Sequence, residues 1–191
     1  MMRLKRTLGL ATFVATVTMS VAGPAWAQPL EQGTFHEEST EIEVGFCDVA
    51  GLTVRVDQVV DGRFLLNPHG PDGLAYGLVT ELFTIVFTNV DNGITVTEVT
   101  NVIFKDLHVT DNGDGTLTIL VLGTGNDVVY GPDGMAIARN PGQLRFEVLI
   151  DSGGTPSDPF DDEFLAFLGF VKESTGRTDD FCAAMVPVLM G

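Results

Sequence analysis

The sequence contains few basic residues, few cysteines and few histidines. Its 191 residues include 10 Lys and Arg against 26 Asp and Glu, with three His and two Cys. Binding to nucleic acid requires clustered Lys and Arg, so this composition excludes a nucleic-acid partner and disfavours anionic membrane surfaces. The histidines His36, His69 and His108 match no zinc-ligand spacing. The negative charge instead favours solubility, cation uptake or contact with a basic partner.

Catalytic signatures and long apolar segments are also missing. The chain has no G-x-S-x-G nucleophile elbow, no H-E-x-x-H zinc motif and no phosphate-binding P-loop. We therefore assign no catalytic residue and no organic cofactor. After residue 27, no apolar run reaches the ~18 residues that a membrane-spanning helix requires. The sequence thus predicts a mature chain without a membrane span.

The first 27 residues are typical of a secretory signal peptide. Arg3, Lys5 and Arg6 precede an uncharged, mostly apolar stretch from Leu8 to Ala22, and Ala25-Trp26-Ala27 supplies the small-x-small cleavage pattern. Its removal leaves seven of the ten basic residues and all 26 acidic residues, which changes the net charge from −16 to −19. We expect a secreted, extracellular protein, with retention in the cell envelope as the alternative.

The two cysteines, Cys47 and Cys182, lie near the two ends of the expected mature chain. An even number of cysteines in an exported protein usually forms disulfides. A bond between residues so far apart closes a long loop, which stabilises the fold by up to ~5 kcal/mol in the chain-entropy model. The sequence therefore predicts a structural Cys47–Cys182 disulfide, and two separate buried thiols are the alternative.

From residue 41 to residue 150, apolar and polar residues alternate as in half-buried strands. Turn sequences separate these segments at 70–73, 91–93, 111–115, 131–134 and 140–142. One polar face per strand favours antiparallel pairing. About eight such strands predict a mainly β fold, an antiparallel β-barrel, with a two-layer β-sandwich as the alternative.

The pattern changes to helical spacing after residue 151. Asp158 is a good N-cap with Pro159 in the first helical position. The apolar residues that follow recur at helical spacing: Phe160, Phe164, Phe167, Leu168 and Val171. A second short helix is predicted from Thr178 to about Val186, ending at Pro187. We therefore expect a flexible N-terminal arm at 28–40 and a single domain at 41–191, with one or two short helices from about residue 158.

Four acidic residues at the start of the first predicted helix are candidate calcium ligands, because hard cations prefer several carboxylate oxygens. They are Asp158, Asp161, Asp162 and Glu163. Capping of the helix and compensation of its dipole explain the same residues without a metal. Calcium is therefore the only cofactor that the sequence brings into consideration.

A ligand pocket in a barrel needs a few polar groups to orient its contents. The candidates are Tyr76, Asp106, His108, Tyr130, Arg55 and Arg145. Asp106 and His108 are two residues apart in an alternating segment, which places both on one face of the predicted strand. This pair would be the acid–base group of the lumen if the protein were an enzyme.

Several stretches resemble a group of small exported proteins of actinomycete bacteria. These stretches are Pro141–Glu147, Asp151–Pro159, Phe181-Cys182, Asp111–Leu117, Phe87-Thr88-Asn89 and Asn92-Gly93. The resemblance covers most of the mature chain and implies export and a β-rich domain. Members of the group are generally described as hypothetical proteins, so the resemblance implies no activity and no catalytic residues.

Three functions fit these observations. The first is a non-enzymatic binding module that holds a small, partly apolar ligand in the mouth of the barrel. The second is an isomerase-like or cyclase-like enzyme with its polar groups in the same lumen. The third is an extracellular or envelope interaction protein without a pocket, which would work through its acidic surface.

Overall fold

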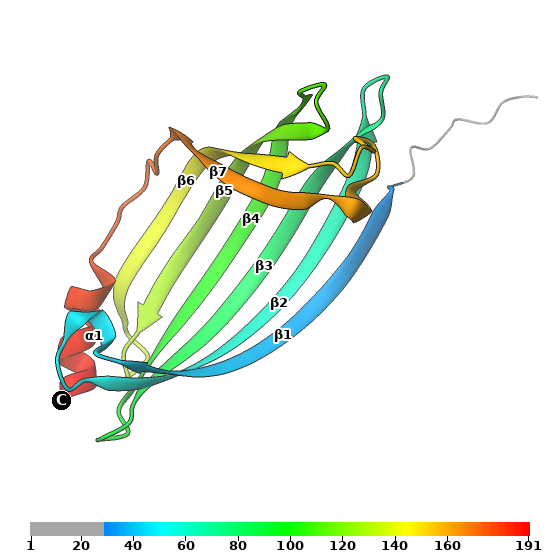
Figure 1. Cartoon of the computed structure of the whole chain (residues 1–191). Coiled ribbons are helices and arrows are strands. Elements are labelled where there is room, and N and C mark those ends of the chain that lie inside the picture. The colour runs from blue at the N-terminus through cyan, green and yellow to red at the C-terminus, as the bar shows by residue number, and fades with distance from the viewer. Residues whose placement is uncertain (1–28) are drawn as a thin grey trace, which may run out of the picture.

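The computed structural model describes residues 29–191, and the expected signal peptide lies outside the described residues. Seven antiparallel strands form one sheet, in which neighbours in sequence are neighbours in space (Figure 1). The mainly β, antiparallel prediction is confirmed. The strands are β1 (Glu31–Val44), β2 (Thr53–His69), β3 (Leu74–Asn89), β4 (Thr95–Asp111), β5 (Thr116–Tyr130), β6 (Ala136–Asp151) and β7 (Glu163–Lys172). The helical elements are the 3-10 turns η1 (Phe46–Asp48) and η2 (Pro159–Asp161) and the helix α1 (Phe181–Met190).

The sheet is curved but not closed, because its edge strands β1 and β7 are not paired with each other in the described chain. The closed barrel is therefore not confirmed. The sheet has seven strands rather than about eight; the predicted turn at 140–142 lies inside β6, and a segment predicted as helix forms β7. None of the helices within residues 29–191 is long and apolar enough to cross a membrane.

Pro141 is accommodated in β6 because its nitrogen faces the edge that β7 leaves open. Two residues before it, the Arg139 N–H donates to the Asp179 carboxylate at 3.0 Å. Two residues after it, the Gln143 carbonyl accepts from the Thr175 N–H at 3.3 Å. Pro141 therefore turns its nitrogen to the same edge, where the sheet requires no ladder donor.

The predicted flexible arm at 28–40 is wrong, because residues 31–44 form β1 and pair with β2 along their whole length. Two reciprocal glycine–phenylalanine pairs explain why this segment pairs with β2 as a regular strand. Phe35 lies opposite Gly62, and Gly33 lies opposite Phe64. Each ring occupies the space that a side chain on the facing glycine would need. The two rings thereby cover backbone that would otherwise be exposed.

The first of the short C-terminal helices, predicted from about residue 158, is also wrong. Asp158 caps as expected, accepting from the Phe160 N–H at 3.2 Å, but η2 ends after three residues. The segment then becomes β7, whose pairing with β6 has three register shifts. Phe164, Phe167 and Phe170 oppose Ile150, Val148 and Phe146, so three residues of β7 span two of β6. The three-residue spacing that resembles a helix is therefore the spacing of a bulged strand.

The helix α1 starts at Phe181, where the Asp180 side chain accepts from the Ala183 N–H at 2.9 Å. Pro187 does not end it, contrary to prediction, because Leu189 beyond it is fully buried. The Leu189 carbonyl accepts hydrogen bonds from the Asn89 and Asn92 side chains, both at 2.9 Å. These bonds satisfy a carbonyl that a helix terminus leaves without an internal partner.

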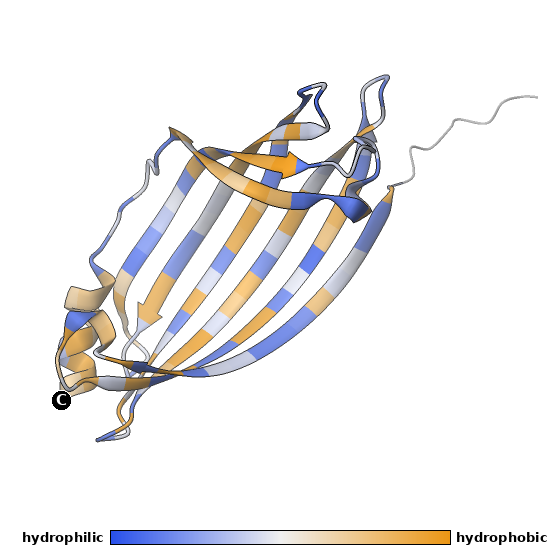
Figure 2. Ribbon diagram, in the orientation of Figure 1, coloured by the Kyte–Doolittle hydropathy of each residue, from blue (hydrophilic) through white to orange (hydrophobic). Residues whose placement is uncertain are grey.

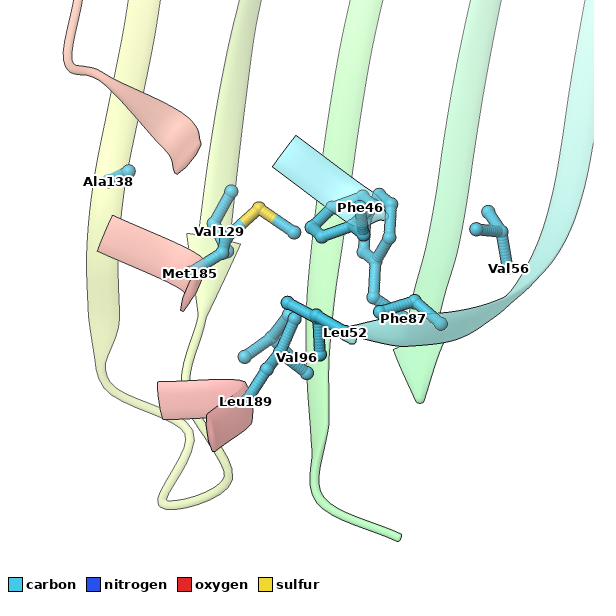
Figure 3. Close-up of a cluster of buried hydrophobic side chains, with 10 residues drawn as sticks. Phe46, Leu52, Val56, Phe87, Val96, Val129, Ala138, Met185 and Leu189 are labelled. Carbon is cyan, nitrogen blue, oxygen red and sulfur yellow. The ribbon is translucent and has the colours of Figure 1, made fainter. Parts of the chain in front are cut away.

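One hydrophobic core joins α1, η1 and the sheet at one end of the molecule (Figure 3). Met185 and Leu189 of α1 pack with Phe46 of η1 and with apolar residues of β2 to β6. The predicted Cys47–Cys182 disulfide is confirmed, with 5.6 Å between the two Cα atoms. It connects η1 to α1, so it holds the helix against the sheet.

Candidate functional site

The sheet has two faces, and α1 covers one of them at one end. We call this the inner face; it carries Val54, Phe87, Val96, Val129 and Ala138, which belong to the core under α1. Side chains alternate along a strand, and the strand registers connect each residue to its neighbours. These two facts assign the side chains of β1 to β6 to the inner or the outer face.

The basic residues of the sheet are confined to one of its two faces. All five Lys and Arg residues of β1 to β6 lie on the outer face: Arg55, Arg63, Lys105, Arg139 and Arg145. His36, His69 and His108 of the same strands also lie there. The inner face of these strands carries carboxylates, among them Glu37, Glu81, Glu98, Asp106 and Asp127. A surface of one sign attracts cations and disfavours anions.

A hollow of about 300 Å³ lies on the inner face, and we call it the inner trough. Its apolar lining comes from Phe83, Val102, Phe104 and Leu144. The remaining lining residues are Thr100, Gly123, Thr124, Gly125, Asp127, Asn140, Gly142 and Ser174. An apolar lining with few polar groups is the usual composition of a small-molecule site.

Glycines keep the floor of the trough low. A Cβ on Gly123 would lie 3.3 Å from the Phe104 ring and 3.2 Å from Leu144. A Cβ on Gly142 would collide with the Ser174 hydroxyl. Gly142 thus lets residues 173–180, the segment between β7 and α1, run along the edge of β6. This segment forms one rim of the trough.

Polar side chains cross the trough on three adjacent strands. Thr100 of β4 lies opposite Asp127 of β5, which lies opposite Asn140 of β6. The Asn140 amide donates to Asp127 Oδ2 at 3.3 Å, and the Thr100 hydroxyl donates to Glu98 Oε1 at 3.3 Å. Burial, together with the nearby charge of Asp127, raises the pKa of Glu98. Asp127 lines the trough and Glu98 lies beside it, so two neighbouring carboxylates with no salt-bridge partner in the described residues are the main electrostatic feature here.

A second acidic pair lies farther along the same face. Burial raises the pKa of Glu81 on β3, and the charge of Glu37 on β1 raises it further. The acidic character thus extends from the trough towards β1. Both pairs favour a bound positive charge.

No family model, curated protein or solved structure matches this chain. The trough is therefore interpreted from its own geometry. The resemblance to exported actinomycete proteins stays a prediction.

Two of the predicted pocket groups, Tyr76 and Asp106, lie together where the ladder between β3 and β4 stops. The Gly77 N–H donates to Asp106 Oδ2 at 2.6 Å, and the Val109 N–H donates to the Tyr76 hydroxyl at 3.0 Å. Burial raises the pKa of Asp106, while the bond from Gly77 opposes that rise. The ladder between β3 and β4 ends at Leu78 and Lys105. Beyond that point, the Asp106 carboxylate and the Tyr76 hydroxyl accept hydrogen bonds from backbone N–H groups that no longer have a backbone acceptor on the neighbouring strand. Their role here is structural, although they line a hollow of about 500 Å³.

The other predicted pocket groups do not converge. A register shift between Asp106 and His108 turns His108 to the outer face, where it is exposed, so the predicted pair is wrong. Arg55 is exposed on the outer face and donates to Asp57 at 2.8 Å. Tyr130 and Arg145 belong to the outer face as well. The combination of side chains required for the isomerase-like or cyclase-like site is therefore not assembled.

Two of the four candidate calcium ligands, Asp158 and Asp161, accept hydrogen bonds within the chain, whereas a buried oxygen of Asp162 has no hydrogen-bond partner in the described residues. Asp158 caps η2, and Asp161 accepts from the Thr155 hydroxyl at 2.7 Å. Burial and the charges of Asp161, Asp158 and Asp151 raise the pKa of Asp162. Glu163 begins β7 and is exposed. No group of three His, Cys, Asp or Glu side chains in residues 29–191 is placed to hold a metal ion. Calcium binding stays a prediction, and the melting temperature in calcium against chelator would test it.

Sequence reasoning missed Glu98, Thr100, Asp127 and Asn140. One signal could have found part of this set: Gly123, Gly125 and Asp127 alternate in the chain, which places two glycines and a carboxylate on one face of a strand. Glycines at alternate strand positions often mark a place where a ligand approaches the backbone.

Proposed function

We propose that this protein is a secreted, non-enzymatic binding module that holds a small organic cation with an apolar body in the inner trough. The sequence analysis placed the ligand in the mouth of a predicted barrel; here the ligand binds in the inner trough of the open sheet instead. The disulfide fits an extracellular setting, because such bonds persist in oxidising compartments.

The absence of basic residues of β1 to β6 from the inner face carries this proposal. A ligand in the trough meets Asp127, with Glu98 beside it, and no Lys, Arg or His of β1 to β6 lies on this face to compensate the two charges. A carboxylate ligand would add a third negative charge in a partly buried place. An ammonium group would relieve the repulsion between the two carboxylates and would oppose the rise in the pKa of Glu98.

The apolar lining determines the rest of the ligand. The rings of Phe83 and Phe104 and the side chains of Val102 and Leu144 favour a flat or branched hydrocarbon body. A cation next to an aromatic ring gains further attraction from the ring face. A volume of about 300 Å³ accommodates a fused two-ring compound better than a long chain.

Calorimetric titration with three compounds of one shape tests the proposal: 1-naphthylmethylamine, 1-naphthylmethanol and 1-naphthoate. We expect the amine to bind most tightly, the alcohol weakly and the carboxylate not at all. Asp127→Asn should reduce the affinity for the amine by about tenfold or more, since it removes a charged hydrogen-bond partner.

Asp57→Asn is the matched control, because it removes the same charge from the outer face. It should leave the affinity unchanged. Equal binding of the amine and the carboxylate, or equal effects of the two variants, would contradict the proposal.

A further inference from the structure

The edge strand β7 exposes apolar side chains on both of its faces. Six of its ten residues are large, apolar and about half exposed, and we call this set the β7 edge: Phe164, Leu165, Phe167, Leu168, Phe170 and Val171. The exposed fractions range from 47% to 61%. Figure 2 shows the strand as apolar over most of its length. A soluble protein rarely leaves such a patch uncovered.

The other edge of the sheet has the opposite character. β1 carries five glutamates among its 14 residues, and these charges protect an unpaired edge from association. Within β7, the only charged residues are Glu163 and Lys172, its first and last residues. The chain therefore protects one edge with charge and leaves the other apolar.

The two ends of β7 lie beside like charges of their own chain. Glu163 is the register partner of Asp151, and Lys172 is the register partner of Arg145. Neither Arg145 nor Lys172 has a salt-bridge partner within the described chain. Like charges at opposite positions destabilise a strand pair. The β6–β7 ribbon thus has an acidic end and a basic end, and each needs an opposite charge from elsewhere.

We propose that the β7 edge joins two copies of this chain, with the two β7 strands antiparallel across a two-fold axis. This arrangement places Glu163 of each copy near Lys172 of the other, so the acidic end of each ribbon meets a basic end. The axis passes between Phe167 and Leu168, and the remaining members of the β7 edge face one another on either side. The same patch on both copies is the pattern of a two-fold dimer.

The contact is made by side chains rather than by a continuous ladder. The three bulges between β6 and β7 coil the strand, and such irregularity prevents regular pairing at a sheet edge. Three half-exposed phenylalanines, at roughly 200 Å² of burial per ring residue, give on the order of 300 Å² per copy before the aliphatic side chains are added. The rings of two copies therefore bury on the order of 600 Å² in total, which lies in the range of weak, transient interfaces, so the dimer should dissociate on dilution.

Sedimentation velocity across a dilution series of the mature, disulfide-bonded protein tests this proposal. We expect a reversible monomer–dimer equilibrium. Leu168→Lys should weaken dimerisation by at least about tenfold, because it places two positive charges beside the axis. Circular dichroism of the same variant checks that the exposed substitution leaves the fold intact.

A charge-reversal cycle identifies the antiparallel arrangement. Glu163→Lys alone should weaken the dimer, and the double variant Glu163→Lys/Lys172→Glu should restore it. Glu38→Lys on the β1 edge is the control and should change nothing. A monomer at every concentration, a lack of rescue in the double variant, or an effect of Glu38→Lys equal to that of Glu163→Lys would overturn the proposal.

Discussion

Replacement of Leu189 by alanine tests the packing of α1 on the sheet. Leu189 has no exposed surface and belongs to the core that joins α1, η1 and the strands (Figure 3). Truncation of a fully buried leucine costs about 2–5 kcal/mol, as the sum of lost burial and the cavity that remains. For a domain of this size, 1 kcal/mol changes the melting temperature by about 2–4 °C, so we expect a decrease of roughly 4–20 °C.

The neighbouring residue supplies the control. Met190 lies in the same helix but is 54% exposed, so Met190→Ala should change stability by no more than about 0.5 kcal/mol. Thermal unfolding is followed by circular dichroism with the disulfide intact, which keeps α1 near the sheet in every variant. Equal effects of Leu189→Ala and Met190→Ala would show that α1 does not pack on the sheet, and the account of the core would fail.

Three further predictions concern stability. Cys47→Ala/Cys182→Ala should lower the free energy of unfolding by up to ~5 kcal/mol in urea titration, and an unchanged midpoint would contradict the role of the bond as a clamp. Asn89→Ala removes a buried side-chain donor to the Leu189 carbonyl and should cost about 1–3 kcal/mol, whereas Asn112→Ala, an exposed turn position, should cost less. The fold should be more stable at pH 5 than at pH 7.5, because burial raises the pKa of Glu98 above its unfolded value. The folded state then retains a proton that the unfolded chain releases, so stability decreases as the pH rises through this range; Glu98→Gln should reduce this slope, and an unchanged slope would refute the cause.

Local patterns in the sequence predicted much of the sheet. Alternation and turn residues gave the antiparallel strands and the turns at 70–73, 91–93, 111–115 and 131–134. Composition alone predicted the disulfide, since an exported chain with two cysteines has one pairing available. These features depend on neighbours in the chain or on simple counting, which is why they could be predicted.

The failures involve tertiary pairing. In the sequence, Pro141 indicates a turn. In the structure it lies within β6, because its nitrogen faces an open edge where the sheet needs no N–H donor. The spacing of Phe164, Phe167 and Phe170 indicates a helix in the sequence. In the structure, the bulges in the β6–β7 pair produce the same spacing in a strand. His108 changes face through a bulge of the same kind. Bulges and edges are properties of pairs of strands, so one strand's sequence does not reveal them.

The trough was missed for a related reason. Thr100, Asp127 and Asn140 come from three strands, and only their register brings them side by side. Apart from Asp106, the pocket groups singled out from the sequence were the rarer types, Tyr, His and Arg, which occupy strand junctions and the outer face. In an acidic protein, the face of the sheet that lacks basic residues is the better indicator of a binding site for cations.

The most direct test of the inner trough is a two-dimensional amide NMR titration with 1-naphthylmethylamine. We predict saturable shifts at Gly123, Gly125, Asp127, Asn140 and Gly142, and no comparable shifts when 1-naphthoate is added. Shifts centred on the β7 edge or on the outer face, or the same shifts with both compounds, would contradict the assignment of the inner trough as a site for organic cations.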